Sequence, residues 1–397
     1  MRAGLFRYWT GARRVPSDGR LMKIVSIKPY TVQGPVSDLC FVKVETDGGV
    51  VGYGECSLPG KPHGVSGAVL DLERLLVGAD PTDTEWCWQR GYRHSYWRGG
   101  PILTSGLSGV DVALWDIRGK ISNLPIYKLL GGAVRTRIKL YANCGLSEDP
   151  QEFRKRVREA VALGYKAVKI YPLPPIGAVV DVASVKKVVA SCEAVRDELG
   201  DLDFSVDFHG KLTAAAAVVI EAAIRHTAPL WIEEPVSAEA PQELRRCVER
   251  FTIPIAVGER LFTRWGYLPI LGQQLAGILQ PDVSNAGGIS ELWKIAALAE
   301  AYGVAFCPHN PNGPLQVLAS LHLAASAQMF GMLEHRHDFH EEFARIGGPL
   351  VEIGDDGCCG LPQGVGLGGA PNEAIFSRPV LGKIHESFRP DGAIDDW

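Results

Sequence analysis

The second half of the chain carries eight short apolar runs that alternate with stretches of helical periodicity. The runs are IKLYA (138–142), AVKIY (167–171), DFSVD (203–207), LWIE (230–233), IAVGE (255–259), GILQPD (277–282), VAFCPH (304–309) and MFGMLE (329–334). They recur roughly every 25 to 35 residues, and a helical pattern follows each run except the last. This rhythm is typical of βα units with parallel strands, so we expect an α/β fold built on a (β/α)8-type barrel.

The residues that end these runs are unusually polar. In barrels of this kind the functional side chains lie at the carboxyl ends of the strands. The side chains at these ends are Lys169 and Tyr171, Asp207 and His209, Glu233, Glu259, Asp282, His309 and Glu334. Buried charges are costly unless they are paired or bind a metal. We therefore expect the functional site at this end of the barrel.

Three of these residues are carboxylates at even spacing. Glu233 follows Asp207 by 26 residues, and Glu259 follows Glu233 by another 26, which is one βα unit each time. Three converging carboxylates repel one another unless a cation neutralises them, and oxygen-only ligands favour a hard divalent ion such as Mg²⁺. Each carboxylate could instead pair separately with a basic residue on the rim. The even spacing favours a metal site over that simpler explanation.

Two further strand ends suggest a general base. Asp282 and His309 end successive runs, so they can be neighbours, and a carboxylate bonded to an imidazole fixes its tautomer and raises its basicity. His209 lies two positions after Asp207, where strand alternation would turn both side chains the same way. At this point His209 is either a further metal ligand or a separate proton donor.

A smaller domain precedes the barrel. From Ile24 to about Cys56 the pattern indicates an antiparallel β meander with a hairpin at Asp47-Gly48-Gly49, and helical periodicity follows up to Gly131-Gly132. We expect an α+β domain that covers the barrel mouth. The expected division is a loose extension (1–21), a capping domain (22–137), a barrel domain (138–345) and a C-terminal segment that returns to the cap (346–397).

The composition limits the class of partner and location. With 41 basic and 45 acidic residues the net charge is -4, which provides no basic field for nucleic acid. The longest uncharged apolar run, LTAAAAVVI at 212–220, is about half of the ~20 residues that a membrane span needs. Residues 1–21 lack the apolar core of a secretory signal, and the nine cysteines are scattered without CxxC pairs. We expect a cytoplasmic protein that acts on a small molecule.

Two other patterns carry less weight. GVGLGG at 364–369 resembles a nucleotide-binding fingerprint, but it follows a loop and no strong helical pattern comes after it. The histidines at 335, 337 and 340 could suggest zinc, yet acidic neighbours make a solvated rim the better interpretation. We expect neither a nucleotide cofactor nor a zinc site.

From Met22 to the closing Asp-Asp-Trp the chain resembles the enolase superfamily, in particular its mandelate racemase group and the acid-sugar dehydratases of galactonate and gluconate type. The motifs that carry this resemblance are VDFHGK, WIEEPV, VGERLF, QPDVSNAGG, PHNPNGP and LEH in the barrel, with YWRGGP and ALWDIRGK in the smaller domain. The resemblance implies an enolase-like, modified TIM barrel with a capping domain. It also implies α-proton abstraction, an enediolate stabilised by one Mg²⁺ per subunit, and loss of the 3-hydroxyl to give a 2-keto-3-deoxy acid.

The resemblance assigns a role to each polar strand end. Asp207, Glu233 and Glu259 match the metal ligands; His309 and Asp282 match the base dyad; His209 matches the acid that expels the hydroxyl; and Glu334 matches a carboxyl group that hydrogen-bonds the substrate carboxylate. Elimination of hydroxide needs both an acid and a base, and histidines on two different strands meet that need. His209 is thereby separated from the metal.

One position departs from the racemases of this group. They carry Lys-X-Lys on the second barrel strand, whereas this chain has Lys169-Ile170-Tyr171. Lys169 can still steady the substrate carboxylate, and Tyr171 can donate a hydrogen bond or assist proton transfer. A racemase or epimerase of a 2-hydroxy or amino acid is therefore a weaker alternative, and a non-catalytic protein that binds metal and sugar acid is a second one.

The cap is expected to recognise the distal part of the substrate. Tyr96, Trp97 and Arg98 are candidates for that contact, although packing between the domains would explain the aromatic pair equally well. We also expect the chain to form a homo-oligomer.

Overall fold

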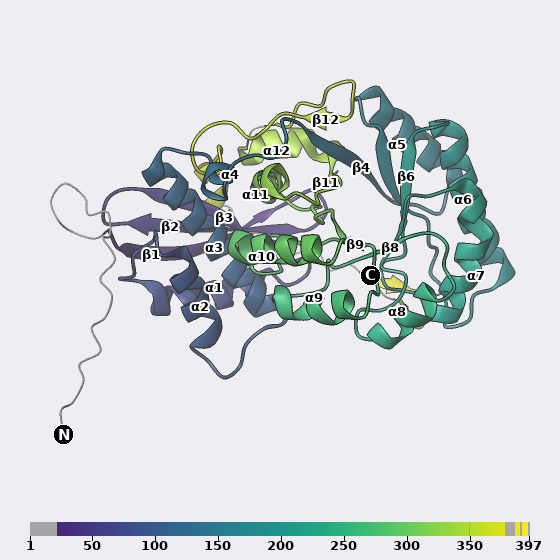
Figure 1. Ribbon diagram of the computed structural model, residues 1–397, viewed down its shortest axis with the longest axis horizontal. Helices are drawn as coiled ribbons and strands as arrows, with labels where there is room; N and C mark the ends of the chain where they lie inside the picture. The colour runs from purple at the N-terminus through teal and green to yellow at the C-terminus, as the bar shows by residue number, and fades with distance from the viewer. Residues whose placement is uncertain (1–21, 349, 378–385, 390, 396–397) are drawn as a thin grey trace.

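The computed structural model describes residues 22–348, 350–377, 386–389 and 391–395. The expected N-terminal extension, residues 1–21, lies outside the described residues. The described chain forms a layered N-terminal unit, the cap, beside a larger ring of strands and helices (Figure 1). No helix within these ranges is both long and apolar enough to cross a bilayer.

The cap is a three-stranded antiparallel sheet covered by helices. Its strands are β1 (Ile24–Gln33), β2 (Asp38–Thr46) and β3 (Val51–Glu55), and its helices are α1 (Pro62–Leu76), α2 (Thr84–Arg93), α3 (Gly100–Ser122) and α4 (Ile126–Leu129). The expected hairpin joins β2 to β3, where Gly49 adopts a φ of 75° that favours glycine. Helix α3 packs directly on β3, because a Cβ at Gly54 would collide with the carbonyl oxygen of Gly109.

The second unit contains eight parallel strands, one from each predicted run. They are β4 (Ile138–Leu146), β5 (Ala167–Tyr171), β6 (Asp203–Asp207), β7 (Ile232–Glu233), β8 (Ile255–Val257), β9 (Ile278–Leu279), β10 (Ala305–Phe306) and β11 (Leu333–His335). They pair in the order β10-β9-β8-β7-β6-β5-β4-β11. An isolated parallel bridge between Phe306 and Phe330 closes the ring. The predicted fold class, a modified barrel with a capping domain, is confirmed.

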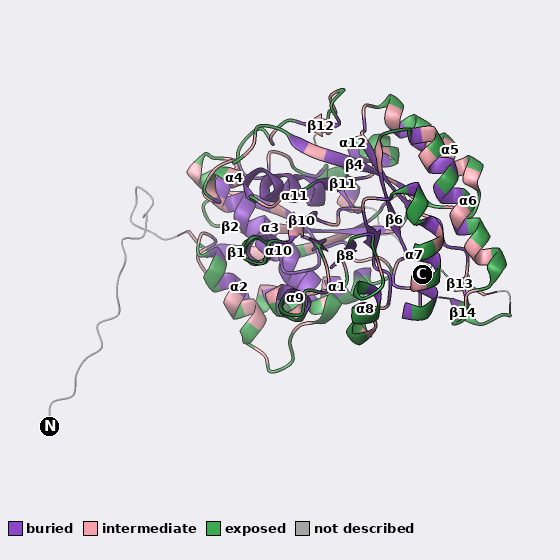
Figure 2. Cartoon of the chain, turned by 45° about the vertical axis from the view of Figure 1, so that its right-hand side comes forward, coloured by how far each residue is buried: buried purple, intermediate pink, exposed green. Residues whose placement is uncertain are grey.

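The barrel helices lie outside the strands. They are α5 (Pro150–Ala162), α6 (Val182–Leu199), α7 (Ala214–Ile224), α8 (Pro241–Val248), α9 (Thr263–Gly272), α10 (Gly288–Ala301) and α11 (Pro314–Ser326), with a single 3-10 turn η1 (Arg225–Thr227) after α7. The last strand differs from expectation, because η2 (His337–Phe339) and a short α12 (His340–Ile346) follow it. Helices α5 to α7 present exposed residues outward and buried residues to the strands (Figure 2).

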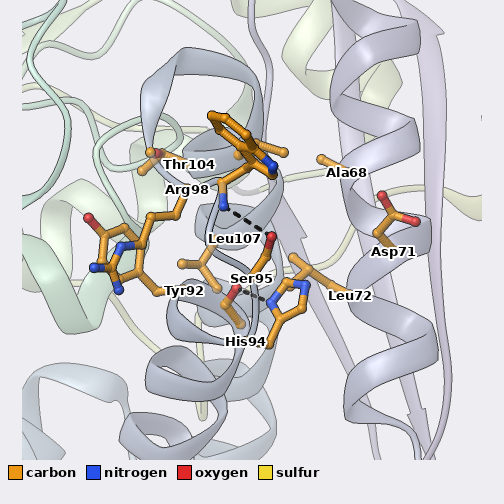
Figure 3. A pocket seen from close by; sticks show the side chains of 13 residues that line it. Ala68, Asp71, Leu72, Tyr92, His94, Ser95, Arg98, Thr104 and Leu107 are labelled. Atoms are coloured by element: carbon orange, nitrogen blue, oxygen red, sulfur yellow. Dashed lines mark hydrogen bonds between the residues drawn. The ribbon is translucent and has the colours of Figure 1, made fainter.

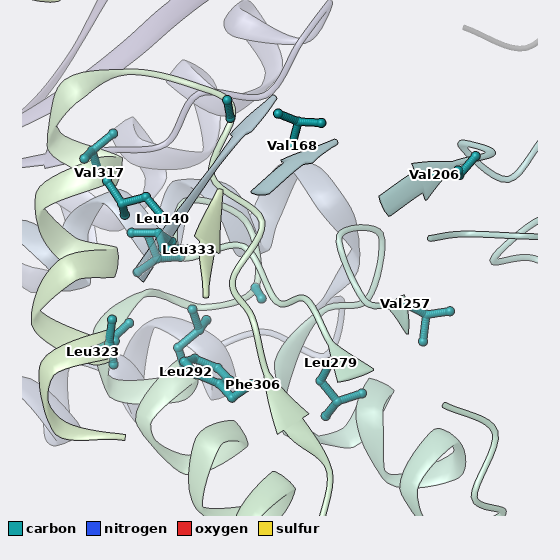
Figure 4. Close-up of a cluster of buried hydrophobic side chains, with 14 of the residues drawn as sticks. Leu140, Val168, Val206, Val257, Leu279, Leu292, Phe306, Val317, Leu323 and Leu333 are labelled. Carbon is teal, nitrogen blue, oxygen red and sulfur yellow. The ribbon is translucent and has the colours of Figure 1, made fainter. Parts of the chain in front are cut away.

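Alternation along the barrel strands divides their side chains between two environments. Outward residues such as Leu140, Val168 and Val206 are buried against the helices, and Leu292 and Leu323 belong to the same core (Figure 4). The residues next to them in sequence point into the ring instead. A separate buried cluster that includes Tyr141, Ala167, Trp231, Ala256 and Cys307 fills that interior. The polar strand ends are therefore supported by a packed apolar core.

The C-terminal segment contacts both units. It contains β12 (Cys358–Cys359), which pairs antiparallel with β4, then η3 (Glu373–Ser377), β13 (Ser387–Phe388) and β14 (Ile394–Asp395). The ring of Phe376 stacks on Tyr30 of the cap, with 4.2 Å between ring centroids. The boundaries expected from the sequence stay predictions; in the structure, α4 ends at Leu129 and β4 begins at Ile138.

Candidate active site

The three evenly spaced carboxylates meet at the carboxyl ends of neighbouring strands. Asp207 and Glu233 are directly paired in the register of β6 and β7, and Glu259 follows the end of β8 by two residues. One oxygen from each lies within 4.8 Å of the others. Asp207 and Glu233 are 4% and 0% exposed, so their mutual repulsion is poorly screened by water. The parallel register of the sheet thus creates a concentrated negative site.

Lys169 lies against this site from the neighbouring strand β5. Its Nζ is 2.6 Å from Glu233 Oε1, 3.3 Å from Asp207 Oδ2 and 3.0 Å from Glu334 Oε1. Burial would lower the pKa of Lys169, but the surrounding carboxylates outweigh it and hold the pKa well above its usual value. Burial raises the pKa of Glu233 well above its usual value even though Lys169 lowers it. The single ammonium group of Lys169 therefore offsets part of the negative charge of three carboxylates.

The carboxylates fit a divalent cation. All the donors are oxygens, the set preferred by hard ions such as Mg²⁺. Glu259 Oε2 is buried, and the ring nitrogen Nε2 of His309 lies 3.1 Å from it. Burial would raise the pKa of Glu259, but the nearby His309 and His209 lower it, so this carboxylate is ionised and able to act as a ligand.

Asp282 and His309 form a hydrogen-bonded pair beside the carboxylates. A parallel β-bridge joins the two residues, and His309 Nδ1 lies 2.8 Å from Asp282 Oδ2. The other ring nitrogen of His309, Nε2, is 3.1 Å from Glu259 Oε2. Burial would lower the pKa of His309, but Glu259 and Asp282 raise it to about 10. A cation bound to Glu259 would offset part of that negative charge and lower this pKa.

His209 reaches the same centre by a different route from the one expected. Strand β6 ends at Asp207, and His209 has a φ of 54°, so simple strand alternation does not orient it. The backbone N–H of His209 donates to Asp207 Oδ1 at 2.8 Å, which fixes this turn. His209 Nε2 lies 3.8 Å from Glu259 Oε1. The two histidines therefore approach the two oxygens of one carboxylate.

Tyr171 lies next to His209. The two rings are 4.9 Å apart between centroids, and the Nζ of Lys211 lies 5.5 Å from the centroid of the Tyr171 ring. Tyr171 ends β5 two residues after Lys169, and its ring lies beside that of His209.

Glu334 is held by several donors at the end of β11. It accepts hydrogen bonds from Asn143 Nδ2 at 2.6 Å and from the backbone N–H of Asn310 at 3.0 Å, in addition to its contact with Lys169. Burial would raise the pKa of Glu334, but Lys169 and His309 lower it to about 2. An ionised carboxyl group accepts hydrogen bonds and does not donate them. Its expected bond to a substrate carboxylate stays a prediction that requires protonation of Glu334.

Comparison with known proteins places this arrangement in a family. Residues 24–131 match the mandelate racemase/muconate lactonizing enzyme N-terminal domain, and residues 152–375 match the enolase C-terminal domain-like family. The chain belongs to the enolase superfamily, in its mandelate racemase group. Members of this superfamily typically bind Mg²⁺, in agreement with the carboxylate cluster.

Two curated relatives are both D-galactonate dehydratases. A D-galactonate dehydratase from Pectobacterium atrosepticum is 35% identical over 392 residues, which cover 95% of this chain and 100% of the relative. A D-galactonate dehydratase from Cronobacter sakazakii is 42% identical over 303 residues, covering 76% of this chain and 78% of the relative.

Solved structures agree with the fold. An enolase superfamily member from Salmonella Typhimurium is 27% identical with a TM-score of 0.86, covering 92% of this chain and 100% of its own. A mandelate racemase/muconate lactonizing enzyme from a Sulfitobacter species is 31% identical with a TM-score of 0.84, covering 89% of this chain and 94% of its own.

The cap residues selected from the sequence lie in the loop between α2 and α3. Tyr96 and Trp97 are 90% and 80% exposed and meet edge to face. The guanidinium of Arg98 lies over the ring of Tyr92, and both residues line a surface pocket between α1, α2 and α3 (Figure 3). The ring, cation-π and hydrogen-bond contacts described for these three residues are all with other residues of the cap. Their part in substrate binding stays a prediction.

The sequence interpretation of the histidine cluster is wrong at one position. His335 is 4% exposed rather than solvated, and its Nδ1 contacts the hydroxyl of Tyr165. Burial lowers the pKa of His335 to about 4, so it is neutral at physiological pH. His335 points away from Glu334 because neighbouring strand residues alternate between the two faces. It supports the packing between β11 and the barrel wall.

Several polar residues around the site were not selected from the sequence. Glu55 at the end of β3 and Asp111 in α3 are buried carboxylates of the cap that bond to the barrel. Gln316 in α11 donates to Asp282. The strand-end rule could not find them because they lie on helices or in another domain. The signal available for Glu55 was its position as the acidic last residue of the third cap strand, in the sequence GYGE.

Proposed function

We propose that this protein is a Mg²⁺-dependent dehydratase that converts a sugar acid, D-galactonate or a close aldonate, to its 2-keto-3-deoxy acid. The observation that carries the proposal is the placement of His309 and His209 at opposite oxygens of Glu259, 3.1 Å and 3.8 Å away. An elimination needs a base and an acid near the same substrate. The activity of the two dehydratase relatives supports the same substrate class.

One Mg²⁺ per subunit would be held by the carboxylates of Asp207, Glu233 and Glu259. When bound, it would stabilise the negative charge that develops on the substrate carboxylate as the α-proton leaves. The three protein ligands leave positions for the substrate, as is usual for Mg²⁺. Lys169 contributes a fixed positive charge beside the substrate carboxylate.

His309 removes the C2 proton. Its Nδ1 is bonded to Asp282, so Nε2 is the nitrogen that faces the reacting centre. His309 must be neutral to act, which the neutralisation of Glu259 by a cation favours. The positive charge that His309 acquires is then stabilised by the carboxylate of Asp282.

His209 gives a proton to the 3-hydroxyl, which leaves as water. The enol that remains takes up a proton at C3 and becomes the ketone, so the overall change is loss of one water molecule. Tyr171 packs against His209 and supports its ring position. Because position 171 is tyrosine, the second strand supplies no second lysine base for racemisation.

The test is to incubate a library of sugar acids that includes D-galactonate in D₂O with Mg²⁺. Keto-acid formation and deuterium incorporation at C2 are both followed by NMR. We expect keto acid from galactonate or a close stereoisomer. Recovered substrate with inverted C2 would instead indicate a racemase, and no turnover or exchange across the library would indicate a non-catalytic binding protein.

The assignment of His209 has its own test. His209→Asn retains a residue that tolerates a positive φ but removes the titratable ring. We expect it to reduce elimination by about 100-fold or more while His309 still exchanges the C2 proton. His226→Asn, at an exposed histidine paired with Glu193, is the control. Equal loss of both reactions in the His209 variant would mean that His209 is structural or a metal ligand.

A further inference from the structure

The carboxylate of Asp282 is held by more than its histidine. Its Oδ1 accepts the backbone N–H of Ser284 at 2.7 Å, and its Oδ2 accepts the amide Nε2 of Gln316 at 2.7 Å. Oδ2 is the same oxygen that bonds His309 Nδ1. Gln316 is 1% exposed and lies in the first turn of α11, outside the set of strand ends that meet the substrate. Its amide therefore determines where the acceptor for His309 lies.

The orientation of the Gln316 amide is fixed from its other side. The backbone N–H of Asn312 donates to Gln316 Oε1 at 2.8 Å, so the NH₂ group must face Asp282. An amide NH₂ donates and does not accept, so Asp282 Oδ2 is an acceptor in this bond. With Oδ2 committed as an acceptor, the Nδ1 of His309 keeps its proton and Nε2 is directed into the site.

The first turn of α11 is in turn held by the cap. Glu55 accepts the backbone N–H groups of Gly313 at 2.7 Å, Leu315 at 3.2 Å and Gln316 at 3.0 Å. Ser57 donates its hydroxyl to Glu55 at 2.7 Å. Glu55 is 1% exposed and belongs to β3, so these bonds cross between the domains. A carboxylate that accepts several backbone N–H bonds restrains the position and direction of that helix end.

We propose that Gln316 is a positioning residue for the His309–Asp282 pair and that Glu55 is the cap residue that keeps Gln316 in place. The inference rests on the proposed function for its kinetic consequence only. A continuous set of bonds runs from Glu55 through the first turn of α11 to Gln316, Asp282 and His309. The cap thus contributes to proton abstraction as well as to enclosure of the substrate.

The kinetic test uses Gln316→Met, which keeps the length of the side chain and removes both hydrogen-bonding groups. We expect kcat for dehydration and the rate of C2 exchange to fall together, by roughly 10- to 100-fold, because a hydrogen bond to a charged group is lost. KM should change less than about twofold, since Gln316 does not touch the substrate. An unchanged exchange rate in a folded variant would overturn the proposal.

A second measurement does not depend on turnover. The proton shared between His309 Nδ1 and Asp282 Oδ2 should give a low-field resonance in the ¹H spectrum of the protein without metal or substrate, assigned by its loss in His309→Asn. Gln316→Met should shift this resonance or broaden it beyond detection. A resonance identical to that of the unchanged protein would overturn the positioning role even if no substrate had been found. Failure of the proposed function alone would leave this resonance test intact.

Glu55→Gln provides a variant one step further from the chemistry. It keeps the size of the side chain but places an amide NH₂ against backbone donors, so we expect a smaller fall in exchange, about 3- to 10-fold. Combined with Gln316→Met, its effect should be much less than additive because both act through one set of bonds. Full additivity of the two substitutions would overturn the link through Glu55, whether or not either variant is slightly less stable.

The matched control is Asp116→Asn. Asp116 is also a buried carboxylate of the cap, but it accepts the backbone N–H groups of Tyr53 and Leu367 and has no bond to α11. Its replacement should leave the exchange rate and the low-field resonance unchanged while lowering the melting temperature. Loss of exchange equal to that in Glu55→Gln would show that any weakening of the cap acts in the same way, and would overturn the specific role of Glu55.

Discussion

The two halves of the barrel mouth are held in different ways. On β6 to β8 the three carboxylates face one another, and Lys169 provides the nearest balancing charge. On β9 and β10 each oxygen of Asp282 accepts a hydrogen bond, from Ser284 on one side and from Gln316 and His309 on the other. The first half gathers several carboxylates around one lysine, whereas the second half holds a single carboxylate whose two oxygens both accept hydrogen bonds.

The same difference extends to the surrounding helices. Helices α10 and α11, which follow β9 and β10, begin at buried cap carboxylates: Asp111 accepts the backbone N–H of Ser290 at 2.9 Å, and Glu55 bonds to α11. Helices α6 to α8 lie on the side of the ring away from the cap (Figure 1). Contacts between the domains therefore restrain the helices that follow the strands of Asp282 and His309, on the side of the ring that faces the cap.

The largest expected effect comes from replacing His309, the proposed base, in the half formed by β9 and β10. His309→Asn should lower dehydration and C2 exchange by about 10³- to 10⁴-fold, because no other neutral imidazole lies at that position. Mg²⁺ affinity should change much less, as His309 is not a ligand in the proposed site. Kinetics in D₂O and calorimetric titration of Mg²⁺ would measure the two effects. A loss of Mg²⁺ affinity as large as the loss of exchange would show that His309 takes part in metal binding.

An intermediate effect is expected in the half that carries the proposed metal ligands. Asp207→Asn should weaken Mg²⁺ binding by roughly 10- to 100-fold or more, since a charged ligand becomes neutral. Asp203→Asn is the matched control, because Asp203 begins the same strand and pairs with Lys139 at 3.2 Å, far from the strand's carboxyl end. Calorimetry should show normal Mg²⁺ affinity for the control. Equal affinity in both variants would remove Asp207 from the metal site.

The smallest effect concerns Asp111, the cap carboxylate bonded to the first turn of α10. Burial raises the pKa of Asp111 to about 7, although hydrogen bonds from Ser290 lower it. A raised pKa in the folded state means that this group's stabilising contribution is fully present below its unfolded value, about 3.9, and is lost as pH rises through about 7. Asp111→Asn removes this dependence on pH.

We therefore compare the melting temperature of Asp111→Asn with that of the unchanged protein. The variant's value minus the unchanged protein's value should rise by about 2 °C or more from pH 5 to pH 8. Differential scanning calorimetry at fixed ionic strength would measure it. Asp71→Asn, at an exposed residue of α1, should show no such trend. A melting-temperature difference for Asp111→Asn that stays constant or decreases with pH would contradict the raised pKa of Asp111.

The sequence predicted the barrel and the convergence of its strand-end residues because both follow from periodicity. One βα unit separates Asp207 from Glu233 and Glu233 from Glu259, and parallel strands bring such positions to the same edge. The metal and proton-transfer roles assigned to these residues stay predictions, as do the cytoplasmic location and the homo-oligomer. What periodicity provides is proximity, and chemistry has to be tested separately.

Other features depend on contacts that no local pattern records. His209 is oriented by a positive φ and a bond to Asp207 rather than by strand alternation. Glu55 and Gln316 are 261 positions apart in the chain and meet only after the cap has docked on the barrel. His335 was expected at a solvated rim because its neighbours are charged, yet the strand buries it against Tyr165, on the face opposite Glu334. Domain docking and strand direction decide these cases.

The position of β14 has a consequence for how the surroundings of His209 are completed during folding. Asp395 in β14 pairs with Lys211 at 3.1 Å, and both side chains are nearly buried. Lys211 in turn lies over the ring of Tyr171, next to His209. The surroundings of His209 therefore depend on a residue 184 positions after Lys211, so they close only when β14 has docked, long after β6 to β8 have been synthesised.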